Sequence, residues 1–213
     1  MIKHNRWTLL ASSILILLPI VFGLVFWNRL PEQMPTHWGI DGTVNGWSSR
    51  PFAVFGLPAL LLLLHWVCVF FTMKDPKNKG QNGKIFALVL WTTPIISLFT
   101  GGMMYAAAFG KEVQPSGFTA LLLGCIFLAV GNYLPKCRQN HTIGIKVKWT
   151  LQNEENWNAT HRFGGKIWVM GGLLLLACTF LPDPAIILAT LSIIPMLVVL
   201  PFAYSYRYHK KHP

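Results

Sequence analysis

Residues 7–28 read WTLLASSILILLPIVFGLVFWN, an apolar stretch without a single Asp, Glu, Lys or Arg. A stretch of about 20 such residues is long enough to cross the hydrocarbon core of a bilayer as a helix. The composition agrees, with 53% hydrophobic residues, 12% charged residues and a mean hydropathy of +0.47. Lipid offers no hydrogen-bond partners to the backbone, so a spanning segment of this kind is expected to be helical.

Similar apolar stretches recur along the 213 residues. We therefore predict an all-α integral membrane protein, a six-transmembrane helical bundle with the spans Trp7–Asn28, Pro51–Met73, Ile85–Phe109, Gly117–Leu134, Phe163–Leu181 and Ala185–Tyr206. A small extracellular hairpin-like cap is expected between the first two spans.

The distribution of Lys and Arg predicts the orientation of this bundle, because the cytoplasmic loops of membrane proteins accumulate these residues. Only three fall on one side of the predicted membrane: Arg29, Arg50 and Lys111. Fifteen fall on the other side: Lys3, Arg6, Lys74, Lys77, Lys79, Lys84, Lys136, Arg138, Lys146, Lys148, Arg162, Lys166, Arg207, Lys210 and Lys211. We therefore predict a multi-pass membrane protein with both termini in the cytoplasm.

The formal charge of +11 raises the question of nucleic-acid binding. The predicted orientation places most of the positive charge on the inner face, where anionic lipid accounts for it, so no direct nucleic-acid partner is expected. Of the four cysteines, Cys68, Cys125 and Cys178 fall within spans and Cys137 in a cytoplasmic loop, so no extracellular disulfide is expected.

Two long polar loops are the places to look for function. Three other connections, 74–84, 110–116 and 182–184, are short and read as simple connectors. The segments 29–50 and 135–162 are longer and rich in Trp, Asn, Gly and His. Long loops in compact proteins are usually functional or disordered, and the Trp content argues against disorder.

In the first long loop, the pairs Asp41–Gly42 and Asn45–Gly46 are strong tight-turn signals, which predict the hairpin-like cap. One interpretation is an aromatic anchor at the membrane surface, because Trp favours the headgroup level. The other is a surface that binds an extracellular ligand, because rigid aromatic side chains beside turns suit peptide recognition. The candidate ligand-binding residues are Pro35, His37, Trp38, Gly42, Trp47 and Arg50.

In the second long loop, Thr150 is a good N-cap, so a short helix is expected to start there and lead toward the fifth span. Asn153, Trp157 and His161 recur every four residues and would share one helix face. Such a segment fits an interfacial amphipathic helix with Trp149 and Trp157 among the headgroups, and it also fits a docking surface for a cytoplasmic partner.

Both loops resemble a known family. The residues that carry the resemblance are Gly131-Asn132, Pro135-Lys136, Arg138, Asn140, Gly144-Ile145-Lys146, Trp149-Thr150-Leu151, Glu155, Trp157 and Thr160-His161-Arg162. This pattern is similar to that of the immunity proteins of the sporulation-delaying peptide toxin, the SdpI family. The pattern Leu30-Pro31, Pro35, His37-Trp38, Gly42, Trp47 and Ser49-Arg50 resembles the domain of unknown function that usually precedes it.

The resemblance implies an N-terminal two-helix unit at residues 1–75 and a four-helix SdpI-like unit at residues 76–213. It also implies a membrane immunity and signalling protein that confers resistance to a secreted peptide toxin and holds an ArsR-type repressor at the membrane. The candidate docking residues are Asn132, Pro135, Arg138, Asn140, Gly144, Trp149, Thr150, Glu155, Trp157, His161 and Arg162.

Other functional classes have weaker support. The sequence has no His-Glu-x-x-His, Cys-x-x-Cys or Gly-x-Ser-x-Gly motif, and a metal site from His141, Glu154, Glu155 and His161 would have irregular spacing, so we expect no enzyme activity, metal or cofactor. A small-solute or lipid-handling transporter is the first alternative. Coupled transporters place ionisable groups at membrane depth, and here only His65 lies deep, where a hydrogen bond to a neighbouring helix is its expected role. A structural subunit of a larger membrane complex is the second alternative.

Overall fold

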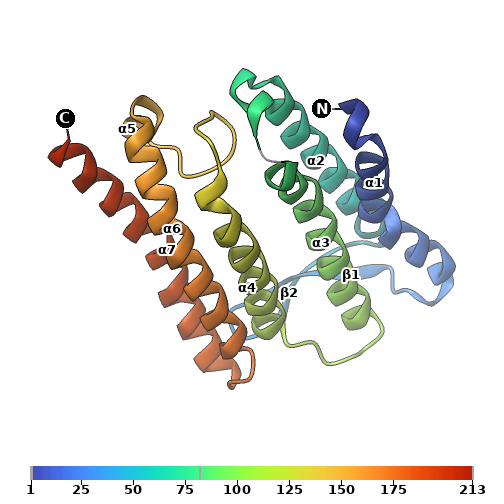
Figure 1. The fold of residues 1–213 in the computed structure, drawn as a ribbon. Coiled ribbons are helices and arrows are strands. Elements are labelled where there is room, and N and C mark those ends of the chain that lie inside the picture. The colour runs from blue at the N-terminus through green and yellow to red at the C-terminus, as the bar shows by residue number, and fades with distance from the viewer. Residues whose placement is uncertain (1, 82, 213) are drawn as a thin grey trace. The chain divides into compact units, whose positions relative to one another are not determined.

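The computed structural model describes residues 2–81 and 83–212, and this part of the chain is mainly helical (Figure 1). The helices in chain order are α1 (Ile2–Val25), α2 (Leu57–Lys74), α3 (Gly83–Ala108), α4 (Pro115–Tyr133), α5 (Lys148–Gln152), α6 (Glu154–Cys178) and α7 (Asp183–Lys211). Short 3-10 turns lie at η1 (Trp27–Arg29), η3 (Pro76–Gly80) and η4 (Leu134–Lys136), and a π-helical turn, η2 (Phe52–Gly56), leads into α2.

Five helices within the described residues are long and apolar enough to cross a membrane. These segments are Asn5–Val25, Phe52–Lys74, Gly83–Ala108, Pro115–Lys136 and Asp183–Lys211, and they correspond to five of the six predicted spans. The remaining predicted span, 163–181, begins in α6 and ends three residues beyond it. This helix is not among the five, because its polar first turns and the charged Arg162 and Lys166 lower its mean hydropathy. The fold is therefore that of a helical, multi-pass membrane protein.

The predicted hairpin is present. Strands β1 (Gln33–Trp38) and β2 (Val44–Ser49) pair antiparallel, and the amide of Gly42 donates to the carbonyl of Gly39 in the turn that joins them. Gly42 has a φ of +79°, a conformation that glycine adopts without strain. The second predicted turn was wrong: Asn45–Gly46 lies inside β2, where Gly46 pairs with His37 at an irregularity of the register.

The contacts divide the chain into two units that are interleaved along the sequence. Unit 1 comprises Met1–Val69 and Val89–Thr119, and unit 2 comprises Phe70–Leu88 and Ala120–Pro213. This division follows packing, whereas the sequence-based division at residue 75 follows the regions that resemble known families.

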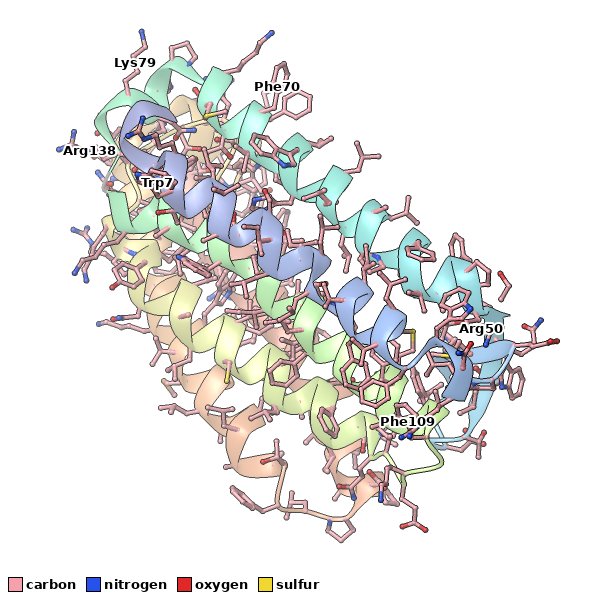
Figure 2. The ribbon with its side chains drawn as sticks, turned by 90° about the vertical axis from the view of Figure 1, so that its right-hand side faces the viewer. Trp7, Arg50, Phe70, Lys79, Phe109 and Arg138 are labelled. Atoms are coloured by element: carbon pink, nitrogen blue, oxygen red, sulfur yellow. The ribbon has the colours of Figure 1, made fainter. Side chains whose placement is uncertain are left out.

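In unit 1 the hairpin packs against the ends of α1 and α3. A buried cluster joins Leu30 and Met34 to Ala53, Val54, Met104 and Tyr105. Figure 2 shows Arg50 and Phe109 at this end of the unit and Trp7 at the opposite end. Deeper in the unit, His65 is fully buried and its Nε2 lies 3.1 Å from the hydroxyl of Ser12 on α1, which confirms its expected role as a hydrogen-bonding residue between helices.

In unit 2 helices α4, α6 and α7 pack through small residues. A Cβ added at Gly172 would lie 2.7 Å from the amide nitrogen of Leu128 and 2.8 Å from the carbonyl of Gly124, so α4 and α6 meet backbone to backbone. The indole of Trp168 donates to the carbonyl of Leu197 on α7. Gly172 therefore permits the close approach of α4 and α6, whereas a Cβ at Gly102 would meet nothing within 4 Å.

Candidate functional site

The β1–β2 hairpin separates its predicted ligand-binding residues into exposed and buried ones. Trp47 is 58% exposed, and His37 is also exposed. Pro35 is buried, and Trp38 is half-buried against the cluster that holds the hairpin. Of the two tryptophans on the strands, Trp47 is therefore the one whose side chain is available to a ligand.

Arg50 holds the base of the hairpin. Its guanidinium donates to the carbonyl of Trp27 at 2.8 Å and to that of Leu30 at 3.1 Å, and it lies 4.6 Å from the centre of the Trp27 ring. These contacts satisfy carbonyl groups where the chain leaves α1. The geometry gives Arg50 a structural role in positioning the hairpin.

The tip of the hairpin is ordered by short side chains. The hydroxyl and the amide of Thr43 both donate to the carboxylate of Asp41, and these hydrogen bonds lower the pKa of Asp41. On the strands, the Nδ1 atom of His37 pairs with the side-chain oxygen of Asn45. Ile40, which is 71% exposed, adds apolar surface at the tip.

The second long loop, residues 135–162, is called the motif loop below. It contains α5 and lies at the same end of unit 2 as the C-terminal end of α7 (Figure 1). Asn140 organises its first part: the side chain is fully buried, its amide donates to the carbonyls of Arg138 and Ile143, and its oxygen accepts the amides of Thr142 and Ile143. One buried side chain thus closes a compact turn.

The sequence predicted that Thr150 caps the helix that leads toward the fifth span, and this prediction was wrong. Thr150 lies inside the separate helix α5, where its hydroxyl accepts the amide of Val147 and lies 3.0 Å from the carbonyl of Ile145. Asn153 is the N-cap of α6, and its side chain accepts the amide of Asn156. The break between α5 and α6 depends on Asn153, an equally good capping residue.

Trp157 and His161 share one buried face of α6, as the four-residue spacing predicted. The prediction that Trp157 lies among lipid headgroups was wrong, because its side chain is fully buried. The rings of Trp157 and His161 stack with centroids 4.0 Å apart, and the indole nitrogen of Trp157 donates to the carbonyl of Cys137. The Nε2 atom of His161 accepts the amide of Ile145, so its Nδ1 carries the proton that faces the carbonyl of Trp157. Burial lowers the pKa of His161 to about 4, which keeps the imidazole neutral.

Gly144 passes directly over this pair of rings. Its φ is +117°, and a Cβ built there would contact His161 Nε2 and lie 3.1 Å from the Trp157 ring. Only glycine satisfies both the backbone conformation and the space. The glycine of the predicted docking motif is therefore explained by packing within the loop.

The segment 74–84, which was predicted to be a simple connector, forms hydrogen bonds to the motif loop. The carboxylate of Asp75 accepts the amide of His141 at 2.6 Å, the side chain of Asn78 donates to the hydroxyl of Thr142, and that of Gln81 exchanges hydrogen bonds with the backbone of Arg138. The sequence did not indicate the role of these residues, because their partners lie roughly 60 positions away in the chain. Local sequence patterns give no information about contacts over such a separation.

The motif loop is also tied to α7. The indole nitrogen of Trp149 donates to the hydroxyl of Ser205 at 2.6 Å, and its ring stacks on that of His209 with a centroid distance of 5.9 Å. Asn156, fully buried, donates to the carbonyl of Ser205 and accepts the Ser205 hydroxyl. Ser205 is a second residue whose role the sequence did not indicate.

The predicted docking residues therefore fall into two groups. The buried or half-buried group forms the internal framework of the loop and consists of Asn140, Gly144, Trp149, Thr150, Trp157 and His161. The exposed group is free to contact a partner and consists of Asn132, Pro135, Arg138, Glu155 and Arg162. Figure 2 shows Arg138 at the surface of this end of the unit.

No set of three or more His, Cys, Asp or Glu side chains within the described residues is arranged to hold a metal ion. The thiol of Cys137 is buried beside Trp157, and burial raises its pKa to about 11. A thiol with this pKa stays protonated at neutral pH and is a poor nucleophile.

The helices and the two structured loops define a polytopic helical membrane protein. Residues 136–205 match the SdpI/YfhL protein family, and residues 14–62 match a domain of unknown function, DUF1648. The chain is also 27% identical over 210 residues to the Immunity protein SdpI of Bacillus subtilis (strain 168), covering 95% of this chain and 96% of that protein. No solved structure matches. The resemblance to the SdpI family, expected from the loop motifs, is confirmed.

Proposed function

We propose that this chain is a membrane immunity protein that confers resistance to a secreted antimicrobial peptide and acts without enzymatic chemistry. The observation that carries this proposal is the match to the Immunity protein SdpI, which extends over 95% of the chain and includes both long loops. A match of that extent relates the whole helical arrangement of this chain to that of the Immunity protein SdpI, whereas a local motif would relate only one loop.

The proposal includes a topology of six spans with both termini in the cytoplasm. The asymmetry of fifteen Lys and Arg against three supports it, and the additional span is the predicted fifth one, 163–181, most of which lies in α6. In this topology the β1–β2 hairpin faces the cell exterior of the bacterial cytoplasmic membrane. The motif loop faces the cytoplasm.

The hairpin supplies the surface that meets the peptide. Trp47 and Ile40 expose apolar area beside polar strands, which suits the apolar face of an amphipathic peptide. Arg50 and the buried cluster beneath the hairpin fix its position, so little ordering entropy is lost on binding.

Signal transduction is the second part of the proposal. The exposed residues of the motif loop, Arg138 and Glu155 among them, dock a cytoplasmic ArsR-type repressor. Peptide binding outside would change docking inside only if the peptide prefers one of two arrangements of the loop.

Survival of a toxin-sensitive host tests immunity. Cells that express the chain are expected to survive added peptide better than cells with an empty vector, and Trp47→Ala is expected to remove most of this gain. Trp7→Ala is the matched control, because Trp7 is 70% exposed but lies at the opposite end of unit 1. Equal survival with and without the chain would refute immunity, and equal survival of the two variants would refute the role of the hairpin.

The location of an ArsR-type repressor tests signalling separately. A fluorescent fusion of the repressor is expected to move to the membrane when peptide is added, and Arg138→Ala with Glu155→Ala is expected to prevent this movement. A repressor that remains in the cytosol under all conditions argues against docking. Peptide-independent solute flux in vesicles containing the purified chain would favour the transporter alternative.

A further inference from the structure

Unit 2 carries an open pocket of about 400 Å³ beside the first turns of α6. Two of its lining residues, Arg162 and Lys166, are cationic and lie one helical turn apart on α6. The other lining residues provide apolar and aromatic walls and are Pro135, Ala159, Phe163 and Tyr204. The pocket therefore combines a positively charged side with a mainly apolar one.

The walls of this pocket are held in place by packing. The rings of Phe163 on α6 and Tyr204 on α7 stack with centroids 4.4 Å apart and an interplanar angle of 10°. On the other side, Pro135 packs so close to Gly165 that a Cβ at this glycine would lie 2.7 Å from the proline ring. These contacts fix the three chain segments around the pocket before any ligand binds.

Among the described residues, Arg162 and Lys166 have no acidic partner. Both side chains are exposed, and neither makes a hydrogen bond or ion pair with any other residue that the structure describes. No acidic residue lines the pocket. Arg162 and Lys166 can therefore both turn toward a single anion placed between them, because residues four apart share a helix face.

The position along α6 indicates which anion would reach them. The helix is polar from Glu154 to His161 and becomes apolar after Lys166. In the proposed six-span topology, on which this step rests, the pocket therefore lies where α6 passes from water into lipid. Basic pockets between helices at this depth meet the anionic headgroups of the inner leaflet. The apolar wall beside the charges suits the glycerol and upper acyl region of a lipid.

We propose that this pocket binds the phosphate-bearing headgroup of an anionic phospholipid, with Arg162 and Lys166 contacting the phosphate and the stacked Phe163 and Tyr204 packing against the lipid. Such a lipid would fasten α6 to α7 and to the start of the motif loop at Pro135. The proposal does not depend on immunity, and it assigns Arg162 to lipid contact.

Native mass spectrometry of the full-length protein, purified in detergent and titrated with lipid, tests the site. Phosphatidylglycerol is expected to bind more tightly than phosphatidylcholine with the same acyl chains. The double variant Arg162→Gln, Lys166→Gln is expected to weaken phosphatidylglycerol binding by about tenfold or more, since each basic residue near a membrane surface contributes to anionic-lipid attraction. Circular dichroism verifies that the variant retains its helix content.

The chain offers a matched control on α7. Arg207 and Lys211 are also an exposed Arg and Lys four residues apart in unit 2, but they do not line the pocket. Arg207→Gln with Lys211→Gln removes the same charge and is expected to change binding less than about twofold if attraction is local to the pocket. Equal losses in both variants, or equal binding of the two lipids, would overturn the proposal. Displacement of phosphatidylglycerol by millimolar inorganic phosphate would instead identify free phosphate as the ligand and overturn the lipid assignment.

Discussion

Asn140 satisfies four backbone groups of the motif loop with one buried side chain. Asn140→Ala would leave these amides and carbonyls without partners, and each unsatisfied buried group costs about 1–3 kcal/mol. Because part of the loop can open to water, we expect the free energy of unfolding to fall by about 3 kcal/mol and hydrogen exchange across residues 138–143 to accelerate. Asn158→Ala, at an exposed site on α6, is the control and is expected to change stability by less than about 0.5 kcal/mol.

His161 makes the stability of this loop dependent on pH. Burial lowers its pKa from 6.5 to about 4 in the folded protein, whereas an exposed histidine in the unfolded chain keeps its ordinary pKa. Between these values the unfolded state binds more protons, so stability is fully present above pH 6.5 and is lost as the pH falls toward 4. The shift corresponds to a loss of about 3 kcal/mol.

Thermal unfolding of the purified protein at several pH values between 6.5 and 4 measures this loss. His161→Gln removes the titrating group, so its stability is expected to fall less steeply over the same range. Other groups titrate in both proteins, and the comparison of the two slopes isolates the contribution of His161. Identical slopes would show that His161 is not the buried neutral residue that the geometry indicates.

Helices α4 and α6 meet where Gly124 faces Gly172, at a distance that admits no side chain. A methyl group at position 172 would press on the backbone of Leu128, which cannot rotate away as a side chain could. We expect Gly172→Ala to lower the free energy of unfolding by about 1–3 kcal/mol, in the range of overpacked cores. Thermal unfolding in detergent, followed by helical circular dichroism, measures the change.

Gly102 provides the opposite case on α3. It lies inside a helix but has no atom within 4 Å of its added Cβ. Gly102→Ala is therefore expected to be neutral or to stabilise the protein by up to about 1 kcal/mol, because alanine has the higher helix propensity. If both alanine variants had the same effect, close packing of α4 on α6 would not be the reason for glycine at position 172.

For the molecule as a whole, the proposed topology places the hairpin and the motif loop on opposite sides of the membrane. Thr43 at the hairpin tip and Lys148 at the start of α5 are both exposed, so each accepts a substituted cysteine. In intact cells a membrane-impermeant maleimide is expected to label Thr43→Cys but not Lys148→Cys, and permeabilised cells are expected to label both. Labelling of Lys148→Cys in intact cells would overturn the topology and, with it, the proposed docking of a cytoplasmic regulator.

The sequence by itself determined the helical membrane fold, the approximate limits of the apolar helices, the hairpin and the family resemblance. Each depends on a local signal: the length of an apolar stretch, a turn pair such as Asp41–Gly42, or a run of loop residues. The same kind of reasoning paired Trp157 with His161, because four-residue spacing alone fixes a shared helix face.

Only the tertiary structure decided which motif residues are exposed and which are buried. Asn140 and Arg138 are two positions apart and look equally polar, yet one is enclosed by the loop and the other faces solvent. Asp75 and Ser205 support the loop from distant parts of the chain, and Arg50 turns inward to hold the hairpin. These outcomes depend on contacts between segments far apart in sequence, and the energy of a contact of this kind is not encoded in any local pattern.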